Sequence, residues 1–358
     1  MVMAQPPRLP TPQTAAPSSA SHRTDGGRYR VAHDARSVNL WRAGYLALLC
    51  VCLSWRLRLD AELGLAWSSA RDTWWLRHDS FEPWLATGAF AFWINCWRVV
   101  DLFCPALQRW RINSTSSEVD LKGQGKLEFV LRPGFSNLAI VAYLLPLLVF
   151  DQLYPRRQLP LGCPTSAELV GGVCCSIFVY DFIFYWIHLA LHKVPWLFRH
   201  VHSTHHRQVD LTSKETGEYA RIRCHNLVTV VVSERLRRAT TVHHSLLDGT
   251  LQVGANIVAL KLLGLHPLTR AVHNIVVTYL LTETHAGYDM PWMLHNVIPC
   301  GVLGGAPRHE AHHHCGSVHY HQFFTYLDRW LGHERADTEY RDEKASKRRD
   351  SDVKTKRK

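Results

Sequence analysis

The stretch YDFIFYWIHLALHKVPWLFRHVHSTHH, residues 180–206, decides the fold because it joins a long apolar run to a dense group of histidines. The apolar run covers residues 169–191 and reaches the ~20 residues that a helix needs to cross a bilayer. At its end, His188 and His192 lie four residues apart and therefore on one face of a helix. The second group of histidines follows at once: His202, His205 and His206. We predict a membrane-crossing helix whose end leads into a cluster of imidazoles.

The His-x-x-His-His pattern occurs a second time, at His309, His312 and His313. Of the 23 histidines, 19 fall between residues 188 and 321, a concentration that neither helix packing nor solubility requires. Imidazole is a ligand for Fe(II), zinc or copper, and the three motifs supply more nitrogens than the four positions of a closed zinc site. The sequence therefore predicts two metal ions.

Five shorter apolar stretches are consistent with tilted spans, re-entrant helices or the buried helices of a soluble core. They cover residues 43–55, 83–97, 137–150, 251–265 and 271–281. The break from Gly264 to Pro267 predicts that the last two stretches form a helical hairpin. A hairpin returns the chain to the side it left, so the histidines before and after it face the same side. We predict an all-α fold, a multi-pass integral membrane helical bundle with a cytosolic histidine-rich di-metal site.

The two ends of the chain are polar. Residues 1–35 are rich in Pro, Ser and Ala, and we expect a disordered tail. Much of the net charge of +11 lies in the basic tail, residues 334–358, without any zinc-finger spacing or RNA-binding motif, so no nucleic-acid partner is expected. The positive-inside tendency places this tail and the histidines in the cytosol. The ten cysteines lack a disulfide or zinc spacing, and we expect mostly buried thiols, Cys174 and Cys175 among them.

One alternative for the last motif is a membrane zinc metalloprotease. His309, Glu310 and His313 satisfy His-Glu-x-x-His, in which two histidines bind zinc and the glutamate is the general base. The run of His314, Cys315 and Gly316 predicts that the helix breaks there, whereas a protease helix should continue. A protease also leaves the upstream histidines unused. A structural zinc or transport role is a further alternative.

The motifs together resemble the fatty acid hydroxylase and sterol desaturase superfamily, most closely its cholesterol 25-hydroxylase-like and methylsterol monooxygenase members. The resemblance covers roughly residues 136–333 and rests on four motifs in family order. They are the stretch quoted first, ETHAGYDMPWMLHNVIP (283–299), GGAPRHEAHH (304–313) and FFTYLDRWLG (323–332). It implies a catalytic domain at 136–333, after N-terminal membrane helices and a loop at 36–135.

What the resemblance implies is O2-dependent hydroxylation or desaturation of a sterol or fatty-acyl lipid at a di-iron centre in the endoplasmic reticulum membrane. The electron donor would be a separate protein of the cytochrome b5 type. The terminal KTKRK also resembles a retrieval signal of that membrane. The implied ligands of the two iron ions are His188, His192, His202, His205, His206, His285, His309, His312 and His313.

We expect supporting roles for several further residues near the motifs. Asp181, Glu283 and Asp289 are candidates for orienting ligand imidazoles, and His295 is a possible outer partner. Asp328 is expected to cap a helix or form a salt bridge. The chain departs from the family pattern at Arg308, where many relatives carry histidine, at Ala286, and at His319 and His321. Residues 219–245 match the family poorly and suggest an insertion, so His243 and His244 receive no role.

Overall fold

The computed structural model describes residues 33–112, 137–153, 159–203, 205–207 and 245–335. Within these ranges the chain forms helices and no β-strand, and its β contacts are two isolated bridges, Arg111–Tyr288 and Leu303–Phe324. The all-α prediction is confirmed for this part of the chain. Most of the polar N-terminal tail, most of the poorly matching segment with His243 and His244, and nearly all of the basic tail lie outside the described residues.

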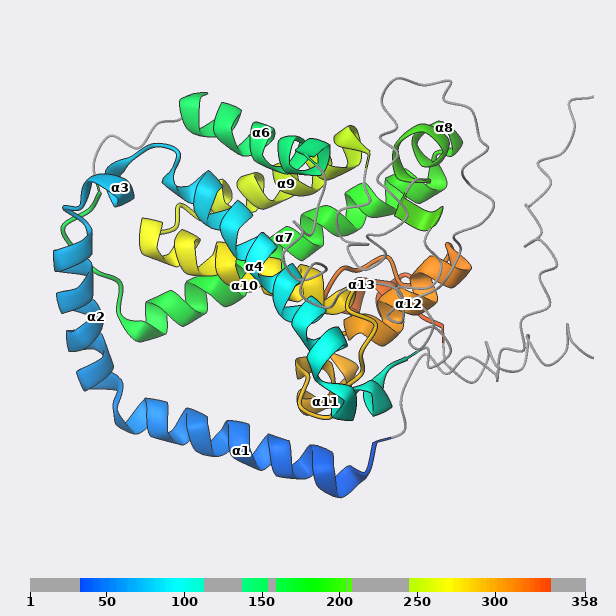
Figure 1. Ribbon diagram of the computed structural model, residues 1–358, viewed down its shortest axis with the longest axis horizontal. Helices are drawn as coiled ribbons and strands as arrows, with labels where there is room; N and C mark the ends of the chain where they lie inside the picture. Colours follow the sequence, from blue (N-terminus) through cyan, green and yellow to red (C-terminus); the bar gives the residue numbers. More distant parts are fainter. Residues whose placement is uncertain (1–32, 113–136, 154–158, 204, 208–244, 336–358) are drawn as a thin grey trace, which may run out of the picture.

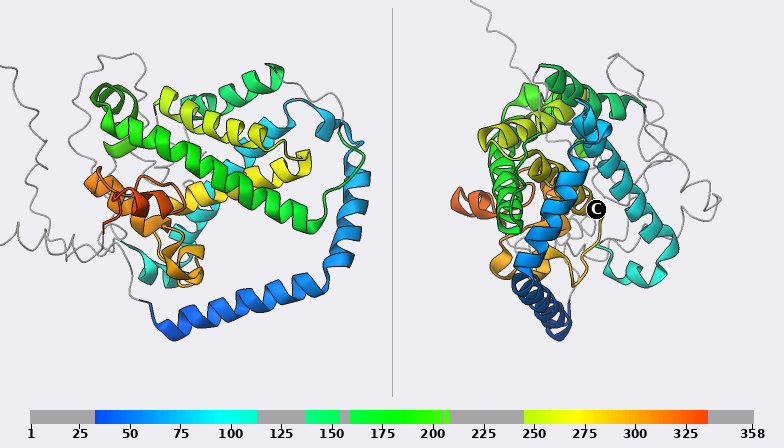
Figure 2. Two further views of the ribbon diagram at one scale, coloured as in Figure 1. Left: turned by 180° about the vertical axis from the view of Figure 1, so that it is seen from behind. Right: turned by 90° about the vertical axis from the view of Figure 1, so that its left-hand side faces the viewer.

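The N-terminal helices run around the outside of the molecule. Helix α1 (Ala35–Ser54) and helix α2 (Arg56–Ala70) form an L beside the bundle, and α3 (Trp74–Arg77) leads back into it (Figures 1 and 2). The first half of α1 is attached to a distant segment, because the Arg42 guanidinium donates to the carbonyl oxygens of Asn296 and Val297. The remaining length of α1 leaves its apolar side chains exposed.

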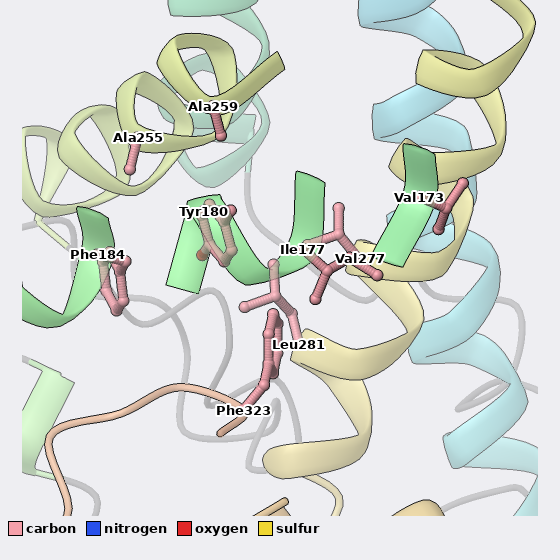
Figure 3. Close-up of a cluster of buried hydrophobic side chains, with 9 residues drawn as sticks. All are labelled: Val173, Ile177, Tyr180, Phe184, Ala255, Ala259, Val277, Leu281 and Phe323. Atoms are coloured by element: carbon pink, nitrogen blue, oxygen red, sulfur yellow. The ribbon is translucent and has the colours of Figure 1, made fainter. Parts of the chain in front are cut away.

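The bundle consists of five helices: α4 (Phe81–Phe103), α6 (Asn137–Leu153), α7 (Ser166–Lys193), α9 (Leu246–Leu262) and α10 (Pro267–Thr284). Helix α10 packs against α4 and α7, and α9 packs against α6 and α7 (Figure 1). Figure 3 shows the core where α7, α9 and α10 meet. Tyr180 and Phe184 of α7 lie there beside Ala255 and Ala259, whose small side chains allow α9 to approach closely.

Helix α7 is the longest element and has a well-defined start. The Thr165 side chain accepts a hydrogen bond from the backbone N–H of Glu168, and the Glu168 carboxylate accepts one from the backbone N–H of Thr165, which is a capping box. The hairpin between α9 and α10 is confirmed: Gly264 adopts a left-handed conformation with φ of 56°, and Pro267 is the first residue of α10. The C-terminal ends of α7 and α10 consequently lie at the same end of the bundle (Figure 1).

Short elements surround that end of the bundle. After α7 come α8 (Pro195–Leu197), the π-helical turn η3 (Phe198–His202) and the 3-10 turn η4 (His205–Arg207). The C-terminal part adds α11 (Leu294–Val297), η7 (Pro299–Gly301), α12 (Gly305–Cys315) and α13 (Tyr326–Trp330), and η1 (Pro105–Trp110) follows α4. Helix α12 ends as predicted, with Gly316 in a left-handed conformation.

Two described helices, α1 and α7, are long and apolar enough to cross a membrane. The sequence pattern predicted this length for α7 alone, because α1 begins eight residues before the apolar stretch at residue 43. The outward face of α7 is apolar and is formed by residues spaced four apart. They are Val170, Cys174, Phe178, Phe182 and Trp186, all exposed. Cys174 and Cys175 are therefore exposed rather than buried, because no segment among the described residues covers this face of α7.

Candidate metal centre

The structure gathers the nine predicted histidines into two buried clusters at the common end of α7 and α10. The five-histidine cluster consists of His188, His192, His202, His206 and His312. The four-histidine cluster consists of His205, His285, His309 and His313. Within each cluster, one nitrogen of every ring lies within 4.8 Å of the others. That these rings bind metal stays a prediction, but the sequence selected the side chains that meet in space.

Helix periodicity explains how α12 serves both clusters. His309 and His313 are one turn apart and point into the four-histidine cluster, with ring centroids 4.7 Å apart. His312 lies between them in sequence and points to the other side of the helix, into the five-histidine cluster. The two clusters adjoin, since the rings of His206 and His313 stack with centroids 4.8 Å apart. The arrangement offers two neighbouring positions for cations.

One short segment orients much of the five-histidine cluster. His188 Nδ1 donates to the carbonyl of Tyr320, and His312 Nδ1 donates to the carbonyl of Val318, both at 2.7 Å. Backbone hydrogen bonds also join His192 to Gly316 and His206 to His313. All four partners lie within residues 313–320, which we call the anchoring segment. Four of the five rings are thus held by the backbone at the end of α12 and directly after it.

The tautomers that these bonds impose leave lone pairs facing one another. A carbonyl can only accept, so His312 carries its proton on Nδ1, and its Nε2 is an acceptor while the ring is neutral. That Nε2 lies 3.1 Å from His206 Nε2. His192 Nε2, surrounded by the other rings, is buried without a hydrogen-bond partner among the described residues. Neutral imidazole nitrogens that converge in this way fit a divalent cation between them.

The protonation state supports this fit. Burial lowers the pKa of His206, His312 and His313 well below the ordinary value, and neighbouring imidazoles lower it further. These rings are therefore neutral at physiological pH, which is the form that binds metals. A protonated cluster of this density would place several positive charges within a buried space.

The four-histidine cluster is oriented more locally. His285 follows the last residue of α10, and its Nδ1 donates to the carbonyl of Leu281, one turn earlier, at 2.8 Å. Its Nε2 lies 2.8 Å from His309 Nε2, which lies 3.1 Å from His313 Nε2. The orientation of His285 thus depends on the end of its own helix and not on the anchoring segment.

Two carboxylates hold the backbone next to the anchoring segment. Asp181 accepts hydrogen bonds from the backbone N–H groups of residues 322–324 and pairs with His321. Asp328 accepts from the backbone N–H groups of Tyr320 and His321. The expectation that Asp181 orients a ligand ring directly is wrong, because it acts on the loop beside the Tyr320 carbonyl. Asp328 has the structural role expected of it, but it holds this loop instead of capping a helix or forming a salt bridge.

The other expected orienting residues lie away from the ligands. Asp289 accepts from His33, His295 and Asn296, and these hydrogen bonds keep its pKa well below the ordinary value although burial alone would raise it. His295 is thus a partner of Asp289 and packs against Gly305 at the start of α12. Glu283 forms a hydrogen bond with Tyr279. The sequence placed these residues near the motifs, but tertiary packing gives them other partners.

The departures from the family pattern lie outside the two clusters. Arg308 belongs to neither cluster and pairs with Glu334. Ala286 packs with the apolar group around Tyr288. His319 is buried in the anchoring segment with a positive φ of 56°, and burial together with the charge of Arg308 lowers its pKa to about 4. His321 pairs with Asp181. None of these side chains is in either cluster.

Sequence reasoning missed Asp248, whose carboxylate accepts a hydrogen bond from His202 Nδ1 at 2.9 Å. Both side chains are about 1% exposed. The one signal in the sequence is that Ser245 and Asp248 have the spacing of a helix start, and the Ser245 side chain does accept from the Asp248 N–H. That signal predicts a helix cap and gives no hint of contact with a metal ligand.

The metalloprotease interpretation finds no support in this geometry. His309 and His313 share their cluster with His205 and His285, and His206 of the neighbouring cluster stacks on His313. The helix break at Gly316 also ends α12 directly after the motif. The histidines of the three motifs therefore meet in one region of the structure. This is expected of a two-metal centre and not of an isolated zinc site.

Comparison with known proteins points the same way. The fatty acid hydroxylase family profile matches residues 173–233. A cholesterol 25-hydroxylase-like protein of Danio rerio is 30% identical over 196 residues, 54% of this chain and 66% of that protein. Cholesterol 25-hydroxylase-like protein 2 of the same organism is 30% identical over 271 residues, 72% of this chain and 82% of that protein. No solved structure matches the chain.

A third relative is a putative methylsterol monooxygenase of Dictyostelium discoideum. It is 30% identical over 234 residues, which cover 64% of this chain and 74% of that protein. The extent of these matches confirms the resemblance that the histidine motifs predicted, and the chain belongs to the fatty acid hydroxylase family.

Proposed function

We propose that this chain is a membrane-embedded oxygenase that uses a di-iron centre and O2 to hydroxylate or desaturate a sterol or related lipid. The observation that carries the proposal is the convergence of nine imidazoles, seven buried and two half-buried, into two adjoining clusters. Their number, and the neutral state of His206, His312 and His313, suit two divalent ions with nitrogen ligands. The names of the relatives, cholesterol 25-hydroxylase-like proteins and a methylsterol monooxygenase, support a lipid oxidation.

The five-histidine cluster would hold one iron ion and the four-histidine cluster the other. When bound, the iron pair supplies the redox chemistry needed to use O2 on an unactivated C–H bond, which no side chain can perform. The protein residues keep the ring nitrogens directed inward, through the anchoring segment and the Leu281 carbonyl. Burial of the rings also excludes water from the reaction.

The exposed apolar faces support a multi-pass arrangement in the membrane. The outward stripe of α7 and the exposed leucines of α1 would contact lipid, whereas the inward face of α7 contains buried polar groups such as Ser176 and Asp181. Apolar outside and polar inside is the distribution expected when lipid replaces water. The histidine clusters would lie at the cytosolic end of α7.

The remaining parts of the proposal concern place and partners. The basic tail, residues 334–358, favours a cytosolic position for this part of the chain, and the resemblance to the family implies the endoplasmic reticulum membrane. Electrons would come from a separate donor of the cytochrome b5 type. Arg156 and Arg157, candidates for contact with an acidic donor, lie outside the described residues.

Metal analysis tests the proposal directly. Protein purified gently from iron-supplemented cells should contain about two irons per chain by mass spectrometry, in line with one ion per cluster. A His205→Ala/His206→Ala variant removes one ligand from each cluster and should lose iron and lipid oxidation together. A single zinc that survives this double change but is lost in His309→Ala would contradict the proposal.

Glu310→Gln separates the oxygenase from a protease. A metalloprotease would lose its general base and its activity, whereas the oxygenase should retain iron and most of its turnover. Peptide cleavage by the unmodified protein that disappears in Glu310→Gln would favour the protease.

A further inference from the structure

The geometry assigns to Asp248 the role of a positioning residue for His202, through which it strengthens metal binding by the five-histidine cluster. The inference rests on the proposed function, because it concerns the metals that the clusters would hold. Asp248 lies in the first turn of α9, far from the histidine motifs in sequence. The contact therefore depends on the packing of α9 against α7.

The contact has the geometry of a carboxylate–histidine–metal triad. Asp248 Oδ2 accepts from His202 Nδ1 at 2.9 Å, which leaves the His202 Nε2 on the side of the cluster. That Nε2 lies 3.1 Å from the His188 Nε2, whose ring is fixed by the Tyr320 carbonyl. Histidines that bind metals commonly donate their outer N–H to a carboxylate, which fixes the tautomer and makes the inner nitrogen a stronger ligand.

The charge of Asp248 distinguishes it from the other outer partners. His188 and His312 donate to neutral carbonyls, whereas His202 faces a carboxylate. A buried negative charge is costly beside neutral rings and becomes favourable beside a divalent cation. Asp248 consequently favours the metal-loaded cluster over the empty one. In the four-histidine cluster, His285 Nδ1 lies against two neutral groups, the carbonyl of Leu281 at 2.8 Å and the hydroxyl of Thr284 at 3.3 Å.

The test compares Asp248→Ala, Asp248→Asn and Asp289→Asn with the unmodified protein. Each protein is loaded anaerobically with Fe(II) and dialysed against a graded series of chelator buffers, and the retained iron is measured at each step. Asp289→Asn is the matched control, because it alters a buried carboxylate that accepts from two histidines outside the clusters. Thermal unfolding of each metal-free protein shows whether the variant is folded.

We expect Asp248→Ala to lower the affinity for one of the two iron ions by about 10–100-fold and to leave the affinity for the other unchanged. Asp248→Asn keeps an oxygen that accepts from Nδ1 but loses the charge, so its affinity should lie between those of Asp248→Ala and the unmodified protein. If Asp248→Ala does not fold, the isosteric Asp248→Asn alone must show the weakened equivalent. Asp289→Asn should retain both irons as the unmodified protein does.

The outcomes separate this inference from the proposed function. Two tightly held irons in Asp248→Ala or Asp248→Asn, as in the unmodified protein, would refute the role of Asp248 and leave the di-iron proposal standing. Equal weakening of both equivalents would show that Asp248 acts on the whole fold and would also refute it. An unmodified protein that binds no iron would overturn both.

Discussion

The two histidine clusters adjoin but are held in place by different means. In the five-histidine cluster, four rings contact the anchoring segment, residues 313–320, and the fifth contacts Asp248 on α9. In the four-histidine cluster, His285 contacts a carbonyl of its own helix. The rings of the five-histidine cluster therefore depend on contacts with other segments, whereas the orientation of His285 in the other cluster depends on the end of its own helix.

The difference predicts that the two metal positions respond separately to mutation. A change that moves the anchoring segment should affect the five-histidine cluster first. A change on α10 should affect the four-histidine cluster first. Helix α12 is common to both, because it contributes His312 to one and His309 and His313 to the other.

The largest effect is expected from two single variants, each of which removes a ligand from one of the two clusters. His312→Ala should release the metal of the five-histidine cluster and His309→Ala that of the four-histidine cluster, so each variant retains about one iron. Both should reduce lipid oxidation to background, because the proposed chemistry uses the pair. Iron content and product formation are measured on the same preparations. Loss of both irons in either variant would show that the clusters do not load independently.

A large loss of stability is expected for Asp181→Ala. The change leaves buried N–H groups of residues 322–324 without their acceptor, and each such group costs about 1–3 kcal/mol. We expect at least about 3 kcal/mol of destabilisation by thermal unfolding, with the five-histidine metal lost before the other. In the His309→Ala background, Asp181→Ala should therefore remove the remaining iron. Asp289→Ala serves as the control, since it removes a buried carboxylate without touching the loop.

A pH-dependent effect is expected from His319. Its pKa is lowered to about 4 by burial and by Arg308, whereas the unfolded chain protonates near the ordinary 6.5. As the pH falls through 6.5 the unfolded chain gains a proton that the folded chain does not, so stability is lost until about pH 4. The loss reaches about 3 kcal/mol. His319→Asn should remove this part of the acid sensitivity, because asparagine tolerates positive φ and does not titrate.

Unfolding free energies at pH 7.5 and pH 5 provide the measurement for His319. The variant and the unmodified protein should differ little at pH 7.5, and the variant should be the more stable of the two at pH 5. An unchanged difference between the two pH values would contradict the assignment.

The smallest effect is expected for Arg308→Ala. The side chain pairs with Glu334 at the surface and lies in neither cluster. Loss of a partly exposed ion pair costs about 0.2–1 kcal/mol, and iron content should stay at two. A loss of iron in this variant would show that Arg308 affects the centre.

The sequence predicted those features that depend on spacing along one helix or on a turn. The positions four apart at His188 and His192, the hairpin at Gly264 and the helix end at Gly316 are all visible as local patterns. Eight of the nine histidines lie in the three histidine motifs, and the ninth, His285, was implied by the resemblance to the family. Local rules were sufficient because each motif lies within one short segment.

The partners of the ligand rings could not be predicted in this way. Asp248 is 46 residues from His202, and only the packing of α9 brings them together. Asp289 and His295 were chosen for their nearness to motifs, yet they bind each other. The anchoring carbonyls leave no trace in the sequence, since every residue has one. The division of the rings into five and four also arises only from the tertiary fold.

The use of backbone carbonyls to orient ligand rings affects which amino-acid changes this centre tolerates. A carbonyl acceptor survives any replacement of its side chain, so Val318 and Tyr320 can be exchanged for other residues without removing the atoms that orient His312 and His188. What the segment must keep is its length and its path. Insertions, deletions and prolines between Cys315 and Tyr320 should therefore be more damaging than replacement of the side chains of Val318 and Tyr320.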